Sequence, residues 1–297
     1  MNYDLLIQLL VNGLIVGTLY GVVAMSFVLI YKASRVVNFA QGELMIIGAF
    51  VCFWLITDLQ LPFFVGFFVC LAFMVIFGAL LQVLVFRPLV GEPIISIIMA
   101  TIGLAIFFQA MLKWLFGVDT LSMPPVFSHE RVDIIGLQVE TPYLLTLVAS
   151  LLTMVLFFWF FTKSRSGLAM RAAAFDQQAA QSMGISIDRV FMLAWAISGV
   201  VSAIAGITLG LVTGVSTALA FTGIKVFPAV ILGGLDSIIG GVVGGIVIGL
   251  LENTAEFIDG QYLHWGNMYE IAPFYVLIVI LMFKPYGFFG TEDIERV

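Results

Sequence analysis

The sequence carries little charge. Lys, Arg, Asp and Glu make up 10% of its 297 residues, whereas a typical soluble domain has about 25%. Hydrophobic residues make up 62%, and the mean hydropathy is +1.16, which excludes a soluble domain. The apolar runs reach the roughly 20 residues that a helix needs to cross a bilayer, which favours helices over barrel strands of alternating polarity. We expect an all-α, polytopic membrane protein with a single transmembrane domain over residues 1–297.

Cysteine and histidine are also scarce, with two of each. Cys52 and Cys70 lie singly in hydrophobic runs, so no pair has metal or redox spacing. His129 and His264 fall in expected external loops. The chain lacks H-E-x-x-H, G-x-S-x-G and the phosphate-binding G-x-x-x-x-G-K-[ST]. We therefore expect no catalytic residue, no metal site, no cofactor in this chain and no nucleic-acid partner.

Nine apolar runs predict about eight transmembrane helices, because one of the runs is short. The expected ranges are 5–31, a second run ending at 56, 61–86, 93–116, 142–161, 190–212, 221–235, 238–251 and 269–283. The run 221–235 is short and interrupted by Pro228 and a Gly pair, so it is either re-entrant or a short crossing helix. A re-entrant segment would conflict with a cytoplasmic Lys284 under the positive-inside rule. We favour a crossing, with the N-terminus outside and the C-terminus inside, although the number of crossings over 221–254 stays open.

Two long polar segments set this orientation. Segment 162–189 has four basic residues against two acidic ones, which predicts a cytoplasmic location. Segment 117–141 is mostly acidic and is expected outside, with a short hairpin in V-D-I-I-G-L-Q-V. The stretch 252–267 is acidic, lacks Lys and Arg, and is also expected to be an external loop.

The cytoplasmic segment is predicted to form one amphipathic helix. Good helix formers run over 168–183, with Ser166-Gly167 before them and Gly184 after them as start and stop signals. Small residues would let this helix seat closely in a groove of another protein. Gly184 is expected at a positive φ. Asp176 is expected to pair with a basic residue of a partner or to cap part of the loop. An ordinary solvated loop is the alternative.

The run A-A-A-F-D-Q-Q-A-A-Q-S-M-G-I within this segment resembles the coupling loop, or "EAA" loop, of bacterial ABC import permeases, in the form seen in branched-chain amino acid permeases. The matching positions also include Met183 and Ile185. The resemblance implies an ATPase-coupling role for Arg171, Ala172, Ala173, Asp176, Ala179, Ala180 and Gly184.

Two further stretches resemble the same family, so the similarity covers roughly 12–287. One is N-F-A-Q-G-E at 38–43; the other is K-V-F-P-A-V-I-L-G-G-L-D-S-I-I-G-G-V-V-G at 225–244, in which Asp236 stands where the family more often has glycine. Polar and glycine residues in these stretches are predicted to lie along the translocation path, because lipid contact would be costly for them. They are Asn38, Gln41, Gly42, Glu43, Gly233 and Gly234.

Three structural questions remain open from these patterns. Paired interrupted helices in opposite halves suggest an inverted repeat around a central path. Glu43 is alternatively a headgroup-level anchor that pairs with Lys32 or Arg35. The tandem G-x-x-x-G at 13–21 either marks a close helix contact or reflects the frequency of glycine in membrane helices.

The resemblance also implies function and partners. The chain is expected to be the shorter of the family's two permease subunits, in the bacterial plasma (inner) membrane. Expected partners are a second related permease, cytoplasmic ATPase subunits that bind ATP and Mg, an external substrate-binding protein and membrane lipid. Branched-chain amino acids are the expected substrates. Urea or short amides are the alternative within the family, and a secondary transporter or channel, using Glu43, Asp236 and Glu252, is the alternative from another class. The residues identify neither the substrate, nor a homodimer or heterodimer of permeases, nor a specific site in the path.

Overall fold

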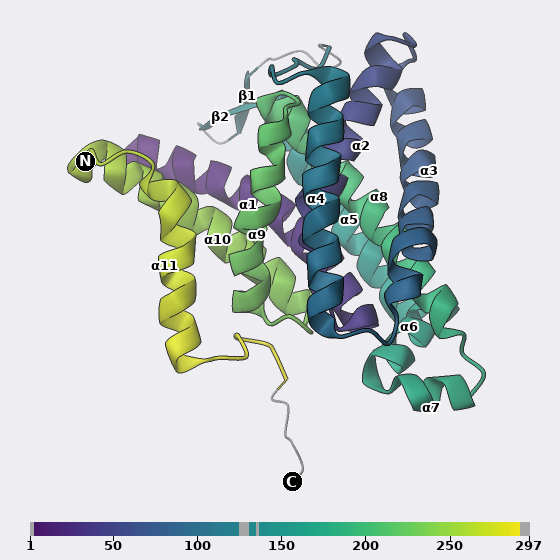
Figure 1. Ribbon diagram of the computed structural model, residues 1–297. Coiled ribbons are helices and arrows are strands. Elements are labelled where there is room, and N and C mark those ends of the chain that lie inside the picture. Colours follow the sequence, from purple (N-terminus) through teal and green to yellow (C-terminus); the bar gives the residue numbers. More distant parts are fainter. Residues whose placement is uncertain (1–2, 125–130, 135–136, 292–297) are drawn as a thin grey trace.

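The computed structural model describes residues 3–124, 131–134 and 137–291, which form a helical bundle with one small hairpin (Figure 1). Six stretches are long and apolar enough to cross a membrane, by length and composition: Leu6–Ser34, Phe63–Leu89, Ile94–Phe116, Thr141–Lys163, Ile187–Thr213 and Ile238–Leu263. Three shorter apolar helices accompany them: Gln41–Thr57, Thr217–Gly233 and Met268–Phe283. The expected all-α membrane fold is confirmed.

The elements follow in this order. The first half contains α1 (Tyr3–Ser34), α2 (Gln41–Thr57), α3 (Phe63–Leu81) with a π-helical turn (Gln82–Phe86) and a 3-10 turn (Arg87–Leu89), α4 (Ile94–Phe116), and the antiparallel strands β1 (Arg131–Ile134) and β2 (Leu137–Glu140). The second half contains α5 (Thr141–Lys163), α6 (Arg165–Phe175), α7 (Gln177–Ser182), α8 (Ile187–Thr213), a 3-10 turn (Thr217–Leu219), α9 (Ala220–Gly233), α10 (Ile238–Ile258) with a π-helical turn (Asp259–Leu263), and α11 (Met268–Phe283).

The connections gather at two opposite ends of the bundle. The strands β1 and β2 and the α2–α3 connection lie at the end that is uppermost in Figure 1, called the hairpin end here. The helices α6 and α7 lie at the other end, called the coupling end, where the chain also leaves α11. The two longest polar segments thus lie at opposite ends, as their charges predict, and the expected hairpin in 117–141 is present.

The helix α9 runs between these two ends. Just before it, Val215 exchanges two backbone hydrogen bonds of 2.8 Å with Leu121, which follows α4 at the hairpin end. At its other end, the amide of Phe288 donates to the carbonyl of Leu232 at 2.8 Å, beyond the end of α11. The stretch 221–235 is therefore a short helix that runs between the two ends, which agrees with the crossing favoured above. In the described part of the chain, six long and three shorter apolar helices make up the bundle.

The glycine repeat of α1 forms a close contact with α10. A Cβ atom added at Gly13 would lie 2.9 Å from the carbonyl oxygen of Gly249, and one added at Gly17 would lie 2.8 Å from the Cα atom of Ile246. Both residues belong to α10, and Gly21 continues the same face against Val242. The G-x-x-x-G pattern is thus a packing face, because only glycine allows the two backbones to approach this closely.

The helix α8 lies at the centre of the other half of the bundle. Gly206 packs on the backbone of Met45 in α2, and Gly199 packs on that of Met74 in α3. The rings of Trp195 and Phe86 stack with centroids 4.1 Å apart. By contrast, α4 and α5 expose most of their apolar side chains, which is the surface expected for contact with lipid or another membrane protein.

The acidic stretch 252–267 is not wholly a loop, so that prediction was wrong for residues 252–263. Helix α10 continues to Ile258, and the π-helical turn extends it to Leu263. Glu252 is 5% exposed and pairs with Lys225 in α9. The absence of Lys and Arg from the stretch misled the prediction, because the cation that pairs with Glu252 comes from a different helix.

Candidate functional site

The predicted coupling helix is broken into two helices at Asp176. The backbone of Asp176 is extended (φ −152°, ψ 111°), and its carboxylate accepts a 2.9 Å hydrogen bond from the amide of Ala179. Asp176 is therefore the N-cap of α7, the second of its two expected roles. The first helix, α6, begins at Arg165 because Ser164 accepts from the amide of Gly167 at 2.8 Å. A single helix over 168–183 was wrong because Ser164 starts the first helix earlier, at Arg165, and the extended Asp176 ends it and caps a second helix.

The end of the segment agrees with expectation. Gly184 has φ +84°, and nothing lies within 4 Å of a Cβ atom added there. Glycine is favoured at this position by the backbone conformation, not by lack of space. The amide of Gly184 donates to the carbonyl of Gln181 at 2.9 Å, and the amide of Ile185 donates to that of Ala180 at 3.0 Å. This short exit leads directly into α8.

The two coupling helices are fastened to the membrane helices around them. Arg171 donates to the carbonyl of Phe161 in α5, and its guanidinium lies over the Phe161 ring, 5.6 Å from the centroid. Ala173 and Ala180, 1% and 4% exposed, face the chain's own core. Of the predicted coupling residues, these three face the chain's own core.

The outward surface of the segment carries two large apolar side chains. Phe175 is 93% exposed and Met183 is 84% exposed, and Ala179 lies exposed between them in the sequence. Large exposed apolar side chains on a polar segment are a feature of surfaces that contact other proteins when they form a patch. Phe175 was missed as a site residue, although an isolated aromatic residue in an alanine-rich polar run is a visible signal.

Gln41 is the centre of a buried polar network. Its side chain is 0% exposed, in the first turn of α2. The Nε2 atom lies 2.6, 3.1 and 2.5 Å from the hydroxyl oxygens of Ser26, Ser198 and Ser202. The Oε1 atom accepts from Nδ2 of Asn38 at 3.0 Å. These contacts join α1, α2 and α8 through hydrogen bonds that satisfy the buried amide.

Glu43 lies in the first turn of α2, where free backbone amides stabilise negative charge. It is 8% exposed, and among the described residues it forms no ion pair with Lys32 or Arg35. Arg35 instead donates to the carbonyl of Ala174 in α6 at 3.2 Å. The anchoring pair considered for Glu43 is thus not formed in this structure.

The glycines of the predicted path lie in two separate places. A side chain at Gly42 would collide with the backbone of Ala220, and one at Gly223 would collide with Gly42, so the first turns of α2 and α9 touch. Gly233 packs against α10, and Gly234, with φ +104°, turns the chain at the coupling end. The structure brings residues 38–43 to the beginning of α9, not to the Gly233-Gly234 turn at its end.

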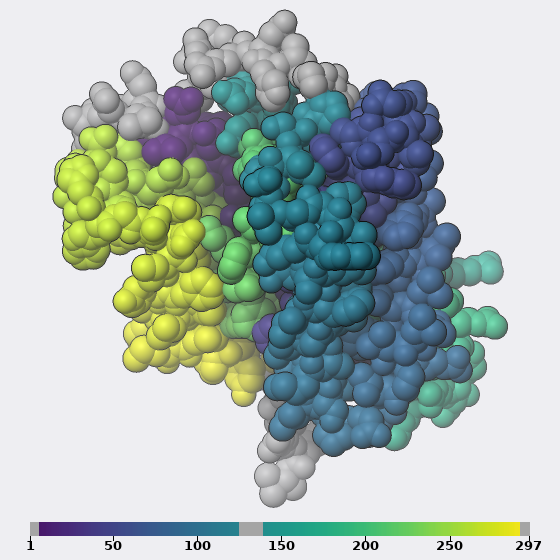
Figure 2. Space-filling model, turned by 45° about the horizontal axis from the view of Figure 1, so that its top comes forward, coloured from purple at the N-terminus to yellow at the C-terminus, as the bar shows by residue number. Residues whose placement is uncertain are grey.

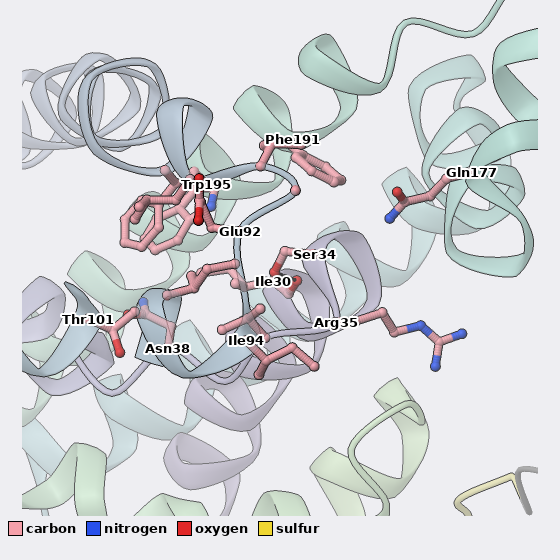
Figure 3. A pocket seen from close by; sticks show the side chains of 16 residues that line it. Ile30, Ser34, Arg35, Asn38, Glu92, Ile94, Thr101, Gln177, Phe191 and Trp195 are labelled. Carbon is pink, nitrogen blue, oxygen red and sulfur yellow. Dashed lines mark hydrogen bonds between the residues drawn. The ribbon is translucent and has the colours of Figure 1, made fainter. Parts of the chain in front are cut away.

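A cavity of about 190 Å³ lies between the polar network and the coupling segment (Figure 3). Its lining includes Asn38 on one side and Gln177 of α7 on the other, with Trp195 and Phe191 of α8 beside them. This space, together with the backbone between α1 and α2, connects the coupling end to the buried amide of Gln41. No group of three His, Cys, Asp or Glu residues in the described ranges is placed to hold a metal ion.

Comparison with known proteins places these features in a family. The model of the family "Branched-chain amino acid transport system / permease component" matches residues 9–283. The chain belongs to this permease family. It is 28% identical to the high-affinity branched-chain amino acid permease protein LivH of Escherichia coli (strain K12) over 305 residues, which cover 98% of this chain and 97% of LivH.

Two further relatives illustrate the range of these permeases. The high-affinity branched-chain amino acid permease protein BraD of Pseudomonas aeruginosa is 29% identical over 308 residues, which cover 98% of each chain. The guanosine ABC transporter permease NupP of Bacillus subtilis is 31% identical over 150 residues, 46% of this chain and 39% of NupP. The present permease is a multi-pass protein of the plasma (inner) membrane and the membrane-embedded component of a transport system.

Proposed function

We propose that this chain is the permease subunit of an ABC importer that moves branched-chain amino acids inward, driven by ATP hydrolysis on separate subunits. One observation carries the proposal: α6 and α7 present Phe175 and Met183 outward while their inner face is fastened to α1, α5 and α8. A segment that is exposed on one side and anchored on the other can transmit the movement of a docked partner to the helices.

The assembly would require three kinds of protein partner and the surrounding lipid. A cytoplasmic ATPase, which binds ATP and Mg, would dock on α6 and α7. A second related permease chain would complete a path that a single chain does not enclose. An external substrate-binding protein would deliver the amino acid at the hairpin end, and lipid would surround the exposed faces of α3, α4 and α5. Substrate selectivity would then rest largely with the binding protein.

The site residues would act in two groups, one in the coupling segment and one along the translocation path. Asp176, Ala179 and Gly184 would shape and present the coupling surface. Arg171, Ala173 and Ala180 would hold that surface to the bundle, with Ala172 between the two faces. In the path, Asn38, Gln41, Gly42 and Glu43 would form the part of the wall nearest the beginning of α9. Gly233 and Gly234 would allow the turn between α9 and α10 at the inner end.

The experiment is uptake by the complete assembly in proteoliposomes. The assembly, loaded with ATP on the cytoplasmic side, is supplied with leucine, isoleucine, valine, urea and acetamide in turn, each with its binding protein. Uptake of the three amino acids that depends on ATP and on the binding protein is expected. Uptake of urea or acetamide alone would support the alternative substrate class. Uptake without ATP, driven by an ion gradient, would support a secondary transporter.

A further inference from the structure

An ion pair joins two apolar helices of the membrane domain. The Nζ atom of Lys225, in the middle of α9, lies 3.7 Å from Oε1 of Glu252 in α10. The other carboxylate oxygen, Oε2, accepts a 2.7 Å hydrogen bond from the hydroxyl of Tyr20 in α1. The ring of Tyr269 in α11 lies 4.8 Å from Nζ. Four helices therefore converge on one ammonium group and one carboxylate.

The ion pair is loose and unequally buried. A separation of 3.7 Å is longer than a hydrogen bond, and Oε1 of Glu252 has no hydrogen-bond partner although it is buried. The side chain of Glu252 is 6% exposed, whereas that of Lys225 is 21% exposed. Tyr20 therefore fixes the carboxylate of Glu252 from the buried side. The more exposed ammonium group of Lys225 has N–H donors that this loose ion pair does not use.

Lys225 is unusual among the basic residues of the chain. The other described Lys and Arg residues lie in connections, in the coupling segment or strand β1, or close to helix ends; Lys225 alone lies in the interior of a membrane helix. An ionisable residue at such a position faces a partner or a water-filled path, because contact with lipid is costly.

The surface of α9 is recessed at the face visible in Figure 2. Figure 2 shows α9, in green, recessed between the yellow surface of α11 and the teal surface of α4. Phe221, one turn before Lys225, and its neighbour Ile224 are 61% and 55% exposed. A hollow with one ammonium group beside an apolar surface matches a small molecule that has a carboxylate and an apolar side chain.

We propose that Lys225 binds the α-carboxylate of an amino acid in transit, and that Glu252 is the positioning residue that holds the ammonium group toward the hollow. This inference rests on the proposed function and names the contact that a zwitterion makes inside the membrane domain. A carboxylate that leaves water requires a counter-charge, and Lys225 supplies one at mid-helix. Oε1 of Glu252 attracts the ammonium group of Lys225 without a hydrogen bond. Lys225 can therefore bind the carboxylate of the amino acid and release it again within each cycle.

The test uses the complete assembly in proteoliposomes with saturating leucine-loaded binding protein, and it records leucine uptake and ATP hydrolysis together. Lys225→Met should lower uptake at least tenfold, while ATP hydrolysis stimulated by the loaded binding protein stays within about twofold of wild type. Lys225→Arg should restore most of the uptake, because it keeps the charge. Glu252→Gln keeps the hydrogen bond with Tyr20 and should lower uptake less than Lys225→Met does.

A charge reversal separates this role from a purely structural one. The double variant Lys225→Glu with Glu252→Lys rebuilds the ion pair and should still fail in uptake, because a carboxylate then faces the hollow. Restored uptake by this variant, or normal uptake by Lys225→Met, would overturn the inference. Lys113→Met, at an exposed site near the end of α4, is the matched control and should transport normally. If the wild-type assembly takes up no amino acid, the proposed function fails together with this inference. If the wild-type assembly takes up leucine and Lys225→Met takes it up equally well, the inference fails and the proposed function stands.

Discussion

Gln177 in α7 donates a hydrogen bond from Nε2 to the carbonyl oxygen of Ala33, in the last turn of α1, at 3.2 Å. A second contact runs in the opposite direction, from Arg35 to the carbonyl of Ala174 in α6, also at 3.2 Å. Both helices of the coupling segment are thus tied to the place where the chain leaves α1 and turns toward α2. A displacement of the segment would move the backbone that carries the buried polar network.

The first prediction concerns these two ties. Arg35→Ala combined with Gln177→Ala should lower the number of amino acids transported per ATP several-fold, because the docked ATPase would move a segment that no longer pulls on α1. ATPase binding should be retained, since neither side chain belongs to the exposed apolar surface. Arg165→Ala with Gln178→Ala changes two exposed residues of the same segment and is the control. An unchanged ratio of uptake to hydrolysis in the first variant would contradict this mechanical route.

The second prediction concerns the break at Asp176. Asp176→Ala removes the cap of α7 and should destabilise this helix by about 1 kcal/mol. Hydrogen exchange at the amides of Ala179 and Ala180 should therefore become faster. Asp176→Asn keeps an acceptor and should exchange at nearly the wild-type rate. Equal exchange in both variants would mean that the carboxylate does not hold the helix.

A third prediction compares two adjacent alanines. Ala179 is exposed and Ala180 is 4% exposed. Ala179→Glu should weaken co-purification of the ATPase and leave the thermal stability of the membrane domain unchanged. Ala180→Glu should instead lower that stability, because an unpaired charge in the core costs several kcal/mol. The opposite ranking in a thermal unfolding assay would show that the segment is oriented differently in the assembly.

The fourth prediction concerns the contact between α1 and α10. A Cβ atom at Gly245 would clash with the backbone of Gly21, so Gly245→Val should destabilise the bundle by about 1–3 kcal/mol or more. Gly103 in α4 has nothing within 4 Å of an added Cβ atom, and Gly103→Val is the matched control. Thermal stability in detergent measures both. A similar loss in both variants would point to a general effect of valine and not to this contact.

Much of the fold could be predicted from the sequence, because apolar length and charge at the ends define membrane helices locally. The fourth helix was expected over 93–116 and is found over Ile94–Phe116, and the last was expected over 269–283 and is found over Met268–Phe283. The positive φ of Gly184 followed from its place after a helix. The short helix α9 agrees with the crossing that the position of Lys284 favoured.

The remainder depends on contacts between distant residues. The break at Asp176 was missed because a run of good helix formers outweighed one capping residue. Glu252 was assigned to a loop because its partner, Lys225, lies in another helix. The hydroxyls of Ser198 and Ser202 in α8 attracted no attention, since isolated serines are ordinary in membrane helices until Gln41 is placed among them. The roles of the predicted site residues in transport stay predictions.

The central claim is that α6 and α7 couple ATP hydrolysis on a separate subunit to transport through this chain. The most direct measurement records leucine uptake and ATP hydrolysis simultaneously in proteoliposomes that hold the wild-type assembly or the Gly184→Val variant. A β-branched residue at φ +84° strains the exit of α7. We predict ATP-driven uptake by the wild type, and either hydrolysis without uptake or loss of the ATPase in the variant, with the membrane domain still folded. A variant that retains the ATPase and transports leucine at the wild-type rate would contradict the claim.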